Sequence, residues 1–244
     1  MSERKTVFIT GASRGIGHAT ATYFVERGWR AITCSRDEVP PECPRDERHE
    51  HITVDLAQTS SLPGTVQRLH NILGGEPLHA LVNNAGYSPK GEGGSRLGCL
   101  DGDLGAWERT FGINFFAPVY FSRACAPLLA EVGGSIVNLT SIAGSRVHPF
   151  AGSAYATSKA ALAALTREMA HDFGPRGIRV NAIAPGEIDT AILSPGTEKI
   201  VEEQIPMRRL GTPDEVADVI HFLCEKGSSY VSGAEIQING GQHV

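Results

Sequence analysis

Tyr155 and Lys159 stand four positions apart in SAYATSKAA, residues 153–161, a stretch rich in good helix formers. On a helix, positions i and i+4 share a face, so the phenol and the ammonium can point into the same space. A nearby ammonium favours the phenolate and pulls a phenol pKa of about 10 toward neutrality, as a general acid or base requires. Taken alone, such a pair is more often a solvated lysine beside a half-buried tyrosine, so its meaning depends on the rest of the chain.

A second group of residues with chemical potential follows the apolar run VFIT at residues 7–10. In TGASRGIG, Gly11, Gly15 and Gly17 have the spacing G-x-x-x-G-x-G. Glycines allow a tight turn and close approach of a ligand, and a helix that follows offers free N–H groups to a pyrophosphate. A glycine-rich turn is weak evidence by itself, but its place between a strand and a helix favours dinucleotide binding.

Short β-branched runs alternate with helical patterns along the chain, which predicts a parallel sheet with helices on both faces. The expected fold is a Rossmann-type, doubly wound α/β sheet of about seven strands. No repeat or linker divides the chain, so residues 1–244 are expected to form a single dinucleotide-binding and catalytic domain. The expected strands are 7–10, 30–35, 51–55, 78–84, 135–141, 178–185 and 234–240, and the expected helices are 17–27, 106–131, 154–173 and 213–224, the last capped by Thr212.

Two stretches interrupt this alternation. Residues 35–50 contain Pro40, Pro41 and Pro44, which remove backbone donors and predict a loop with at most one helical turn. Residues 87–106 contain six glycines and predict a mobile surface loop.

The composition favours a protein that binds neither nucleic acid nor membranes. The formal charge is −5 at pH 7 and the isoelectric point is near 6.0, so no basic surface is expected. No signal-peptide core or membrane-spanning run is present in the sequence. The cysteines are scattered and odd in number, which indicates reduced thiols and a cytoplasmic location; they are Cys34, Cys43, Cys99, Cys125 and Cys224.

The histidines suggest no metal site. His49 and His51 lack partners at metal-ligand spacing, and we interpret them as solvated. His148 could contact a substrate bound near Tyr155, but a surface-loop histidine is the favoured interpretation.

Seven motifs in order along the chain resemble the short-chain dehydrogenase/reductase family. The single-domain members similar to 3-oxoacyl-carrier-protein reductase match best, including RLGTPDEVA and SGAEIQINGG near the end. The motifs are TGASRGIG, VDL at 54–56, NNAG at 83–86, Asn114 in FGINFFAP, Ser141 in VNLTSIAG, YATSK at 155–159 and PGEIDT at 185–190.

The resemblance implies hydride transfer between a nicotinamide and a carbonyl or carbinol carbon, with Tyr155 as the acid/base. Lys159 would lower the tyrosine pKa and bind the nicotinamide ribose. Ser141 would hold the substrate oxygen, and Asn114 would kink its helix and bind a water in the proton relay. Ser141 and Tyr155 are fourteen residues apart, one more than in many relatives, so the loop between them is expected to bulge.

The resemblance also implies a set of cofactor contacts. A neutral Ser35 at the end of the second strand, followed by Arg36 and faced by Arg14, favours NADP(H), with NAD(H) as the alternative. Asp37 would favour NAD(H) instead if the register differed by two residues. The remaining expected contacts are Gly11, Ser13, Gly15, Ile16, Gly17, Asp55 at the adenine (alone, a strand-end turn former), Leu56, Asn83, Ala85, Gly86, Tyr155, Lys159, Pro185, Gly186, Ile188 and Thr190.

The substrate stays open at this stage. An NADPH-dependent ketone or 3-oxoacyl reductase is the first hypothesis, a sugar or polyol dehydrogenase the second, and an inactive dinucleotide sensor the third. Relatives place a substrate lid at 191–206; here it holds Ile192 and Leu193 but no cluster of cations, since Lys199 is alone. Relatives pair the helix after Tyr155 across two-fold axes, which implies a homotetramer, with a dimer as the next choice.

Overall fold

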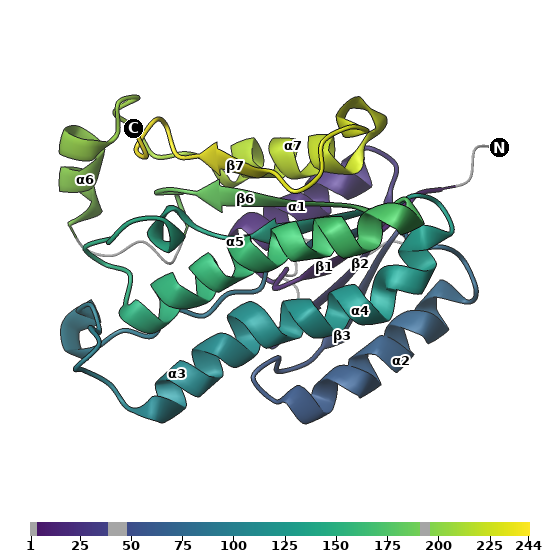
Figure 1. Cartoon of the computed structure of the whole chain (residues 1–244), viewed down its shortest axis with the longest axis horizontal. Helices are drawn as coiled ribbons and strands as arrows, with labels where there is room; N and C mark the ends of the chain where they lie inside the picture. Colours follow the sequence, from purple (N-terminus) through teal and green to yellow (C-terminus); the bar gives the residue numbers. More distant parts are fainter. Residues whose placement is uncertain (1–3, 39–47, 191–195) are drawn as a thin grey trace.

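The computed structural model describes residues 4–38, 48–190 and 196–244. Its centre is a parallel seven-stranded sheet with strand order β3-β2-β1-β4-β5-β6-β7 (Figure 1). This confirms the predicted α/β fold, in which the order reverses between β1 and β4. The strands are β1 (Thr6–Thr10), β2 (Arg30–Ser35), β3 (His49–Thr53), β4 (Ala80–Asn83), β5 (Ser135–Leu139), β6 (Arg179–Pro185) and β7 (Glu235–Ile238).

Helices cover both faces of the sheet, so the central strands are apolar on both sides. Figure 1 shows α3, α4 and α5 in front of the sheet, with α2 beside α4 and α1 and α7 behind. Phe8 packs into the core on the α2–α4–α5 side, whereas Val7 and Ile9 pack on the α1–α7 side. The helices are α1 (Gly15–Glu26), α2 (Leu62–Leu73), α3 (Leu104–Phe111), α4 (Ala117–Ala130), α5 (Ser153–Phe173), α6 (Thr197–Gln204) and α7 (Pro213–Cys224), with Thr212 in a full capping box before α7.

The helix expected at 106–131 is present as α3 and α4, which are joined without a break by one turn of π-helix at Gly112–Phe116, around Asn114. The sequence reading missed α2 and α6, although Leu62, Leu69 and Leu73 of α2 have helical spacing and are buried.

The strand expected at 51–55 is observed at His49–Thr53, and its two histidines are bound rather than solvated. His49 Nε2 lies 3.0 Å and His51 Nδ1 2.8 Å from the Thr33 hydroxyl on β2. Some residues that the sequence analysis named lie outside the described residues; they are Pro40, Pro41, Cys43, Pro44, Ile192 and Leu193.

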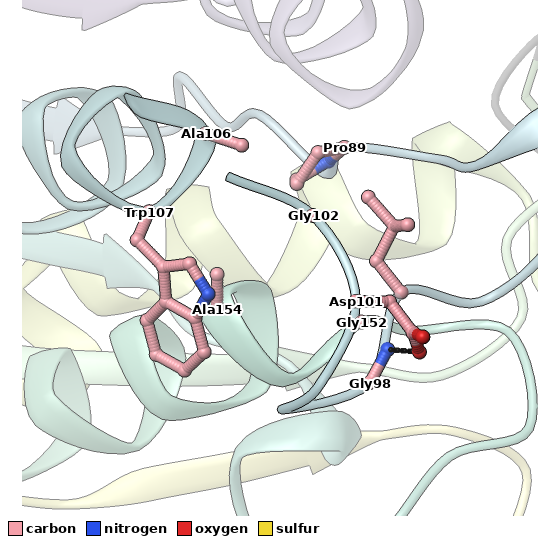
Figure 2. Close-up of a pocket in the computed structure, with 9 residues that line it drawn as sticks. Pro89, Gly98, Asp101, Gly102, Ala106, Trp107, Gly152 and Ala154 are labelled. Atoms are coloured by element: carbon pink, nitrogen blue, oxygen red, sulfur yellow. Dashed lines mark hydrogen bonds between the residues drawn. The ribbon is translucent and has the colours of Figure 1, made fainter. Parts of the chain in front are cut away.

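The glycine-rich segment 87–106 runs against the start of α5. The Ser153 N–H donates to Leu97 O at 2.9 Å, and the Gly98 N–H donates to the Asp101 carboxylate at 2.9 Å. Beneath the segment is a small pocket, in which Figure 2 shows the Trp107 indole beside Ala154 of α5. These bonds attach the loop at Leu97; its predicted mobility stays a prediction.

Among the described residues, no helix combines the length and the apolar character that crossing a membrane requires. In the same residues, no group of three or more histidine, cysteine, aspartate or glutamate side chains could hold a metal ion.

Candidate active site

The candidate residues gather at one edge of the sheet because its strands are parallel and their carboxyl ends meet there. The glycine-rich loop follows β1, residues 84–86 follow β4, Ser141 follows β5, and residues 186–190 follow β6. β5 and β6 are neighbours, with Leu139 opposite Ile183, so Ser141 and Glu187 both lie just beyond adjacent strand ends.

The glycine-rich loop is packed too closely for side chains at two of its positions. Gly11 has φ +71°, and a Cβ on it would lie 2.6 Å from the Ala85 Cα. A Cβ on Gly17 would overlap the Gly11 carbonyl and the Asn84 amide. Gly15, at φ +56°, would place a Cβ 3.4 Å from the Thr190 side chain. The loop therefore brings the segments after β1, β4 and β6 together.

The start of α1 has free backbone donors. Arg14 precedes the helix without any side-chain cap, and the first turn contains no acidic residue. The positive end of the helix dipole is therefore uncompensated, as an anion-binding helix start requires. Together with the glycine cradle, this arrangement fits a dinucleotide pyrophosphate.

Two residues that the sequence analysis left out hold this loop in place. The Thr10 hydroxyl accepts hydrogen bonds from the Asn84 and Ala85 N–H groups at 3.1 and 3.0 Å. The Asn84 side-chain amide donates to Thr10 O at 2.8 Å and to Gly11 O at 2.9 Å. The signal was available, because Asn84 is the second asparagine of NNAG directly after a strand.

Tyr155 and Lys159 both lie on α5, as the spacing predicted. The Lys159 side chain is buried, with 3% of the residue exposed, and its Nζ donates to Leu139 O at 2.6 Å. Nζ lies 5.7 Å from the centre of the Tyr155 ring. Burial lowers the pKa of Lys159 to about 8, since the ammonium is removed from water.

The pKa of Tyr155 moves in the direction opposite to the expected one. Burial raises it most, the nearby Ser141 hydroxyl lowers it, and the nearby Glu187 carboxylate raises it further. The cost of desolvating the phenolate outweighs the attraction that the sequence analysis assigned to Lys159. The phenol is therefore protonated at neutral pH, which suits a proton donor. The Lys159 bond to Leu139 O joins this part of α5 to the end of β5.

Asn114 lies in the π-helical turn between α3 and α4 and is completely buried. Its Oδ1 accepts from the Tyr87 N–H at 2.8 Å, and its Nδ2 donates to Tyr87 O at 3.0 Å and to the Ser158 hydroxyl at 2.9 Å. A Cβ on Gly86 would lie 3.6 Å from Lys159 Nζ and 4.0 Å from Asn114 Oδ1. The local helix irregularity expected at Asn114 is present; its water-binding role stays a prediction.

The residues expected at the adenosine end of the cofactor differ in how far they are exposed. The buried Ser35 hydroxyl donates to Asp37 O at 2.5 Å and lies 3.1 Å from His51 Nε2. The exposed Arg36 lies 3.7 Å from the Asp37 carboxylate, and Arg14 is exposed across the loop.

Asp55 accepts from the Ala57 N–H at 3.0 Å, so it does form the strand-end turn, and its Oδ2 lies 3.9 Å from Arg109. Leu56 is buried in the core.

Some expected contacts have side chains that face the interior. Asn83 donates to Asn138 Oδ1 at 2.8 Å and to Ser122 at 3.2 Å, so a cofactor contact there would use its main chain. Ile188 is buried, and Ile16 packs against the same core cluster. The other expected residues have small side chains. Ser13 lies in the glycine-rich loop, and Pro185 and Gly186 lie at the end of β6.

His148 is not a surface histidine, which corrects the sequence-based interpretation. Its Nε2 lies 2.6 Å from Glu187 Oε1, and the two side chains are only 9% and 11% exposed. The neighbouring residues 145–147 are exposed, and nothing in the sequence indicated that His148 beside them would be buried in a pair.

Comparison with known proteins agrees with this geometry. The family model described as enoyl-(acyl carrier protein) reductase matches residues 11–243. The chain is similar to Protein FixR of Bradyrhizobium diazoefficiens, with 57% identity over 99% of this chain and 88% of that protein.

Solved structures give the same result. The chain resembles a short-chain dehydrogenase/reductase from Brucella ovis, in complex with a partially ordered NAD, with 51% identity, TM-score 0.82 and coverage of 97% and 100% of the two chains. It also resembles 3-oxoacyl-[acyl-carrier protein] reductase from Brucella melitensis, with 33% identity, TM-score 0.90 and coverage of 99% and 92%. The chain belongs to the short-chain dehydrogenase/reductase family of oxidoreductases.

Proposed function

We propose that this protein interconverts a carbonyl and a secondary alcohol with a nicotinamide cofactor, and that it works as an NADPH-dependent ketone reductase. The observation that carries the proposal is the position of the Tyr155 ring 5.7 Å from the Nζ of the buried Lys159, which is bonded to Leu139 O at the end of β5, two residues before Ser141. An inactive dinucleotide sensor has no need of this arrangement.

The proposed roles follow from the chemistry of each side chain. The cofactor, when bound, supplies or accepts the hydride. Ser141 donates a hydrogen bond to the substrate oxygen as negative charge develops on it. Tyr155, kept protonated by burial, donates the proton to that oxygen. Lys159 stabilises the phenolate that remains, and Asn114 fixes the position of Tyr87 and Ser158 around them.

The glycine-rich loop and the start of α1 would hold the pyrophosphate, and Asp55, Ala85, Gly86 and Thr190 lie along the same edge for the rest of the cofactor. We propose that the protein occupies the cytoplasm, where its free thiols, Cys34, Cys99, Cys125 and Cys224, stay reduced and NADPH supports reduction.

We expect a preference for NADPH over NADH of about 10²-fold in kcat/KM. β2 ends at the neutral Ser35, and the exposed Arg14 and Arg36 would supply the cations for a 2′-phosphate bound there. Each charge-assisted hydrogen bond contributes about 1.5–3 kcal/mol, and 1.4 kcal/mol is about tenfold.

Steady-state kinetics with both cofactors test this preference, with Arg36→Ala expected to remove most of it. The equally exposed Arg176→Ala is the matched control. A parent protein that prefers NADH would show that Asp37, beside Arg36, decides the selectivity instead.

We also propose a homotetramer, with a dimer as the next choice. The outer side of α5 has small, partly exposed residues, including Ala160, Ala161 and Ala163, and Phe116 at the start of α4 is more than half exposed. Such a surface is suited to close helix pairing. Light scattering at micromolar concentration is expected to give four times the chain mass, and a monomer mass would refute the proposal.

The second candidate substrate class is a sugar or polyol. This class is favoured by the buried polar pair of His148 and Glu187, because an apolar acyl chain would offer the pair no hydrogen bond. A similar solved structure, aldohexose dehydrogenase of Thermoplasma acidophilum, has 31% identity and TM-score 0.84. A panel of 3-oxoacyl thioesters, simple ketones and sugars, assayed in both directions, separates the two classes.

A further inference from the structure

Glu187 is held firmly at the edge of the sheet where the reaction is proposed to occur. It lies two residues beyond β6, as Ser141 lies two residues beyond the neighbouring β5. The Gly211 N–H donates to Glu187 O at 3.0 Å, and the Asp189 N–H donates to Gly211 O at 2.8 Å. Because the backbone is fixed on both sides, the carboxylate has a defined position.

The hydrogen bonds of His148 indicate which of its ring nitrogens donates to Glu187. The Phe150 N–H donates to His148 Nδ1 at 3.2 Å, so this nitrogen carries a lone pair. The proton of the neutral ring is therefore on Nε2, which donates to Glu187 Oε1 at 2.6 Å. A second ring proton would face the Phe150 N–H. Glu187 Oε1 is thus the acceptor of this pair.

One oxygen of this carboxylate is left for a ligand. Oε1 accepts from His148, whereas Oε2 has no hydrogen-bond partner among the residues that the structure describes. The surrounding charged and titratable groups are Lys90 and Tyr155. Burial lowers the pKa of Lys90, which Glu187 partly opposes, and burial raises the pKa of Tyr155, to which Glu187 adds. Lys90 Nζ donates to Phe150 O at 2.6 Å. Oε2 is not among the buried polar atoms that lack a partner, so it is open to solvent and a donor group of a bound substrate can replace water there.

We propose that Glu187 is a specificity-determining residue whose free carboxylate oxygen accepts a hydrogen bond from a hydroxyl or ammonium group beside the reacting carbonyl of the substrate. The inference rests on the proposed reductase function and narrows its substrate to α-hydroxy or α-amino carbonyl compounds. A methyl group in the same place would leave the carboxylate unpaired, and a carboxylate would be repelled by it.

Four ketones of the form CH₃–CO–CH₂–X test this with one changed group. They are hydroxyacetone, aminoacetone, butanone and acetoacetate. We expect kcat/KM for hydroxyacetone or aminoacetone to exceed that for butanone by about tenfold to a hundredfold, the value of a charge-assisted hydrogen bond, with acetoacetate poorest. The relative rates of the first two identify hydroxyl or ammonium as the preferred donor.

Variants of Glu187 then assign the preference to this residue. Glu187→Gln keeps an acceptor for His148 but loses the charge, so it is expected to lose the preference for aminoacetone and to tolerate acetoacetate better. Glu187→Asp keeps the charge but withdraws it by one methylene, so discrimination against acetoacetate remains while the hydroxyacetone preference falls. The same exchange at an exposed acid at the end of α1, Glu26→Gln, is the matched control.

A pH profile adds a readout that altered packing would not give. Because Glu187 raises the pKa of Tyr155, Glu187→Gln is expected to shift the alkaline loss of butanone reduction to lower pH. Equal kcat/KM for all four ketones, or unchanged ratios in Glu187→Gln, would overturn the inference while leaving the reductase function intact. If no ketone is reduced, the proposed function fails instead. Calorimetric binding of hydroxyacetone and aminoacetone to the NADPH-loaded protein then decides on Glu187, and equal binding to the parent and Glu187→Gln would reject its role.

Discussion

Replacing Tyr155 by phenylalanine is expected to lower kcat for ketone reduction by about 10²-fold or more, the usual contribution of a positioned acid or base. The substitution removes one oxygen atom and leaves the ring that packs near Lys159. Cofactor binding should change little, because Lys159 and the glycine-rich loop are intact. Steady-state kinetics and fluorescence titration with NADPH measure the two quantities separately.

Tyr230→Phe is the matched control, since this tyrosine is fully exposed and far along the chain from the site. It should behave like the parent protein. A Tyr155→Phe variant with parental turnover would remove Tyr155 from the mechanism, whatever the effect on the control.

Adding a methyl group at Gly17 is expected to weaken cofactor binding by about tenfold or more. Alanine is normally the better helix former by up to about 1 kcal/mol. Here its Cβ would overlap the Gly11 carbonyl and the Asn84 amide, and such overpacking costs about 1–3 kcal/mol. The overlap can be removed only if the loop moves away from Asn84. This movement would disturb the backbone that is proposed to hold the pyrophosphate.

Gly64→Ala provides the comparison, because a Cβ on Gly64 in α2 would meet nothing within 4 Å. Thermal melting should show a small gain for Gly64→Ala and a loss for Gly17→Ala. If NADPH binds equally to Gly17→Ala and the parent, the loop is not the pyrophosphate site.

The strands could be predicted from sequence because the central strands of a parallel sheet are buried on both faces and appear as short apolar runs. β2 was predicted with its observed ends, and β1 and β5 to within two residues. The edge strand β3 was misplaced because its exposed side permits His49 and Glu50. Helix α2 was missed because Pro63 and Gly64 obscured a pattern that its buried leucines satisfy.

The candidate site was predictable in its motifs but not in its electrostatics. The spacing of Tyr155 and Lys159 was sufficient to place both on α5. The sign of the Tyr155 pKa shift depends on burial and on Glu187, and neither follows from spacing. The pairing of His148 with Glu187 joins residues 39 positions apart, so only the folded chain brings them together.

The central claim is that hydride passes between a nicotinamide and a carbonyl carbon while Tyr155 moves the proton. The most direct test incubates the protein with NADPH deuterated at the transferring position and with the ketone panel, and examines the alcohol products by mass spectrometry. The proposed mechanism predicts one deuterium on the carbinol carbon of at least one product, and formation of this labelled product about 10²-fold slower with Tyr155→Phe. Alcohol products without deuterium, or labelled product formed at the parental rate by the Tyr155→Phe variant, would contradict it.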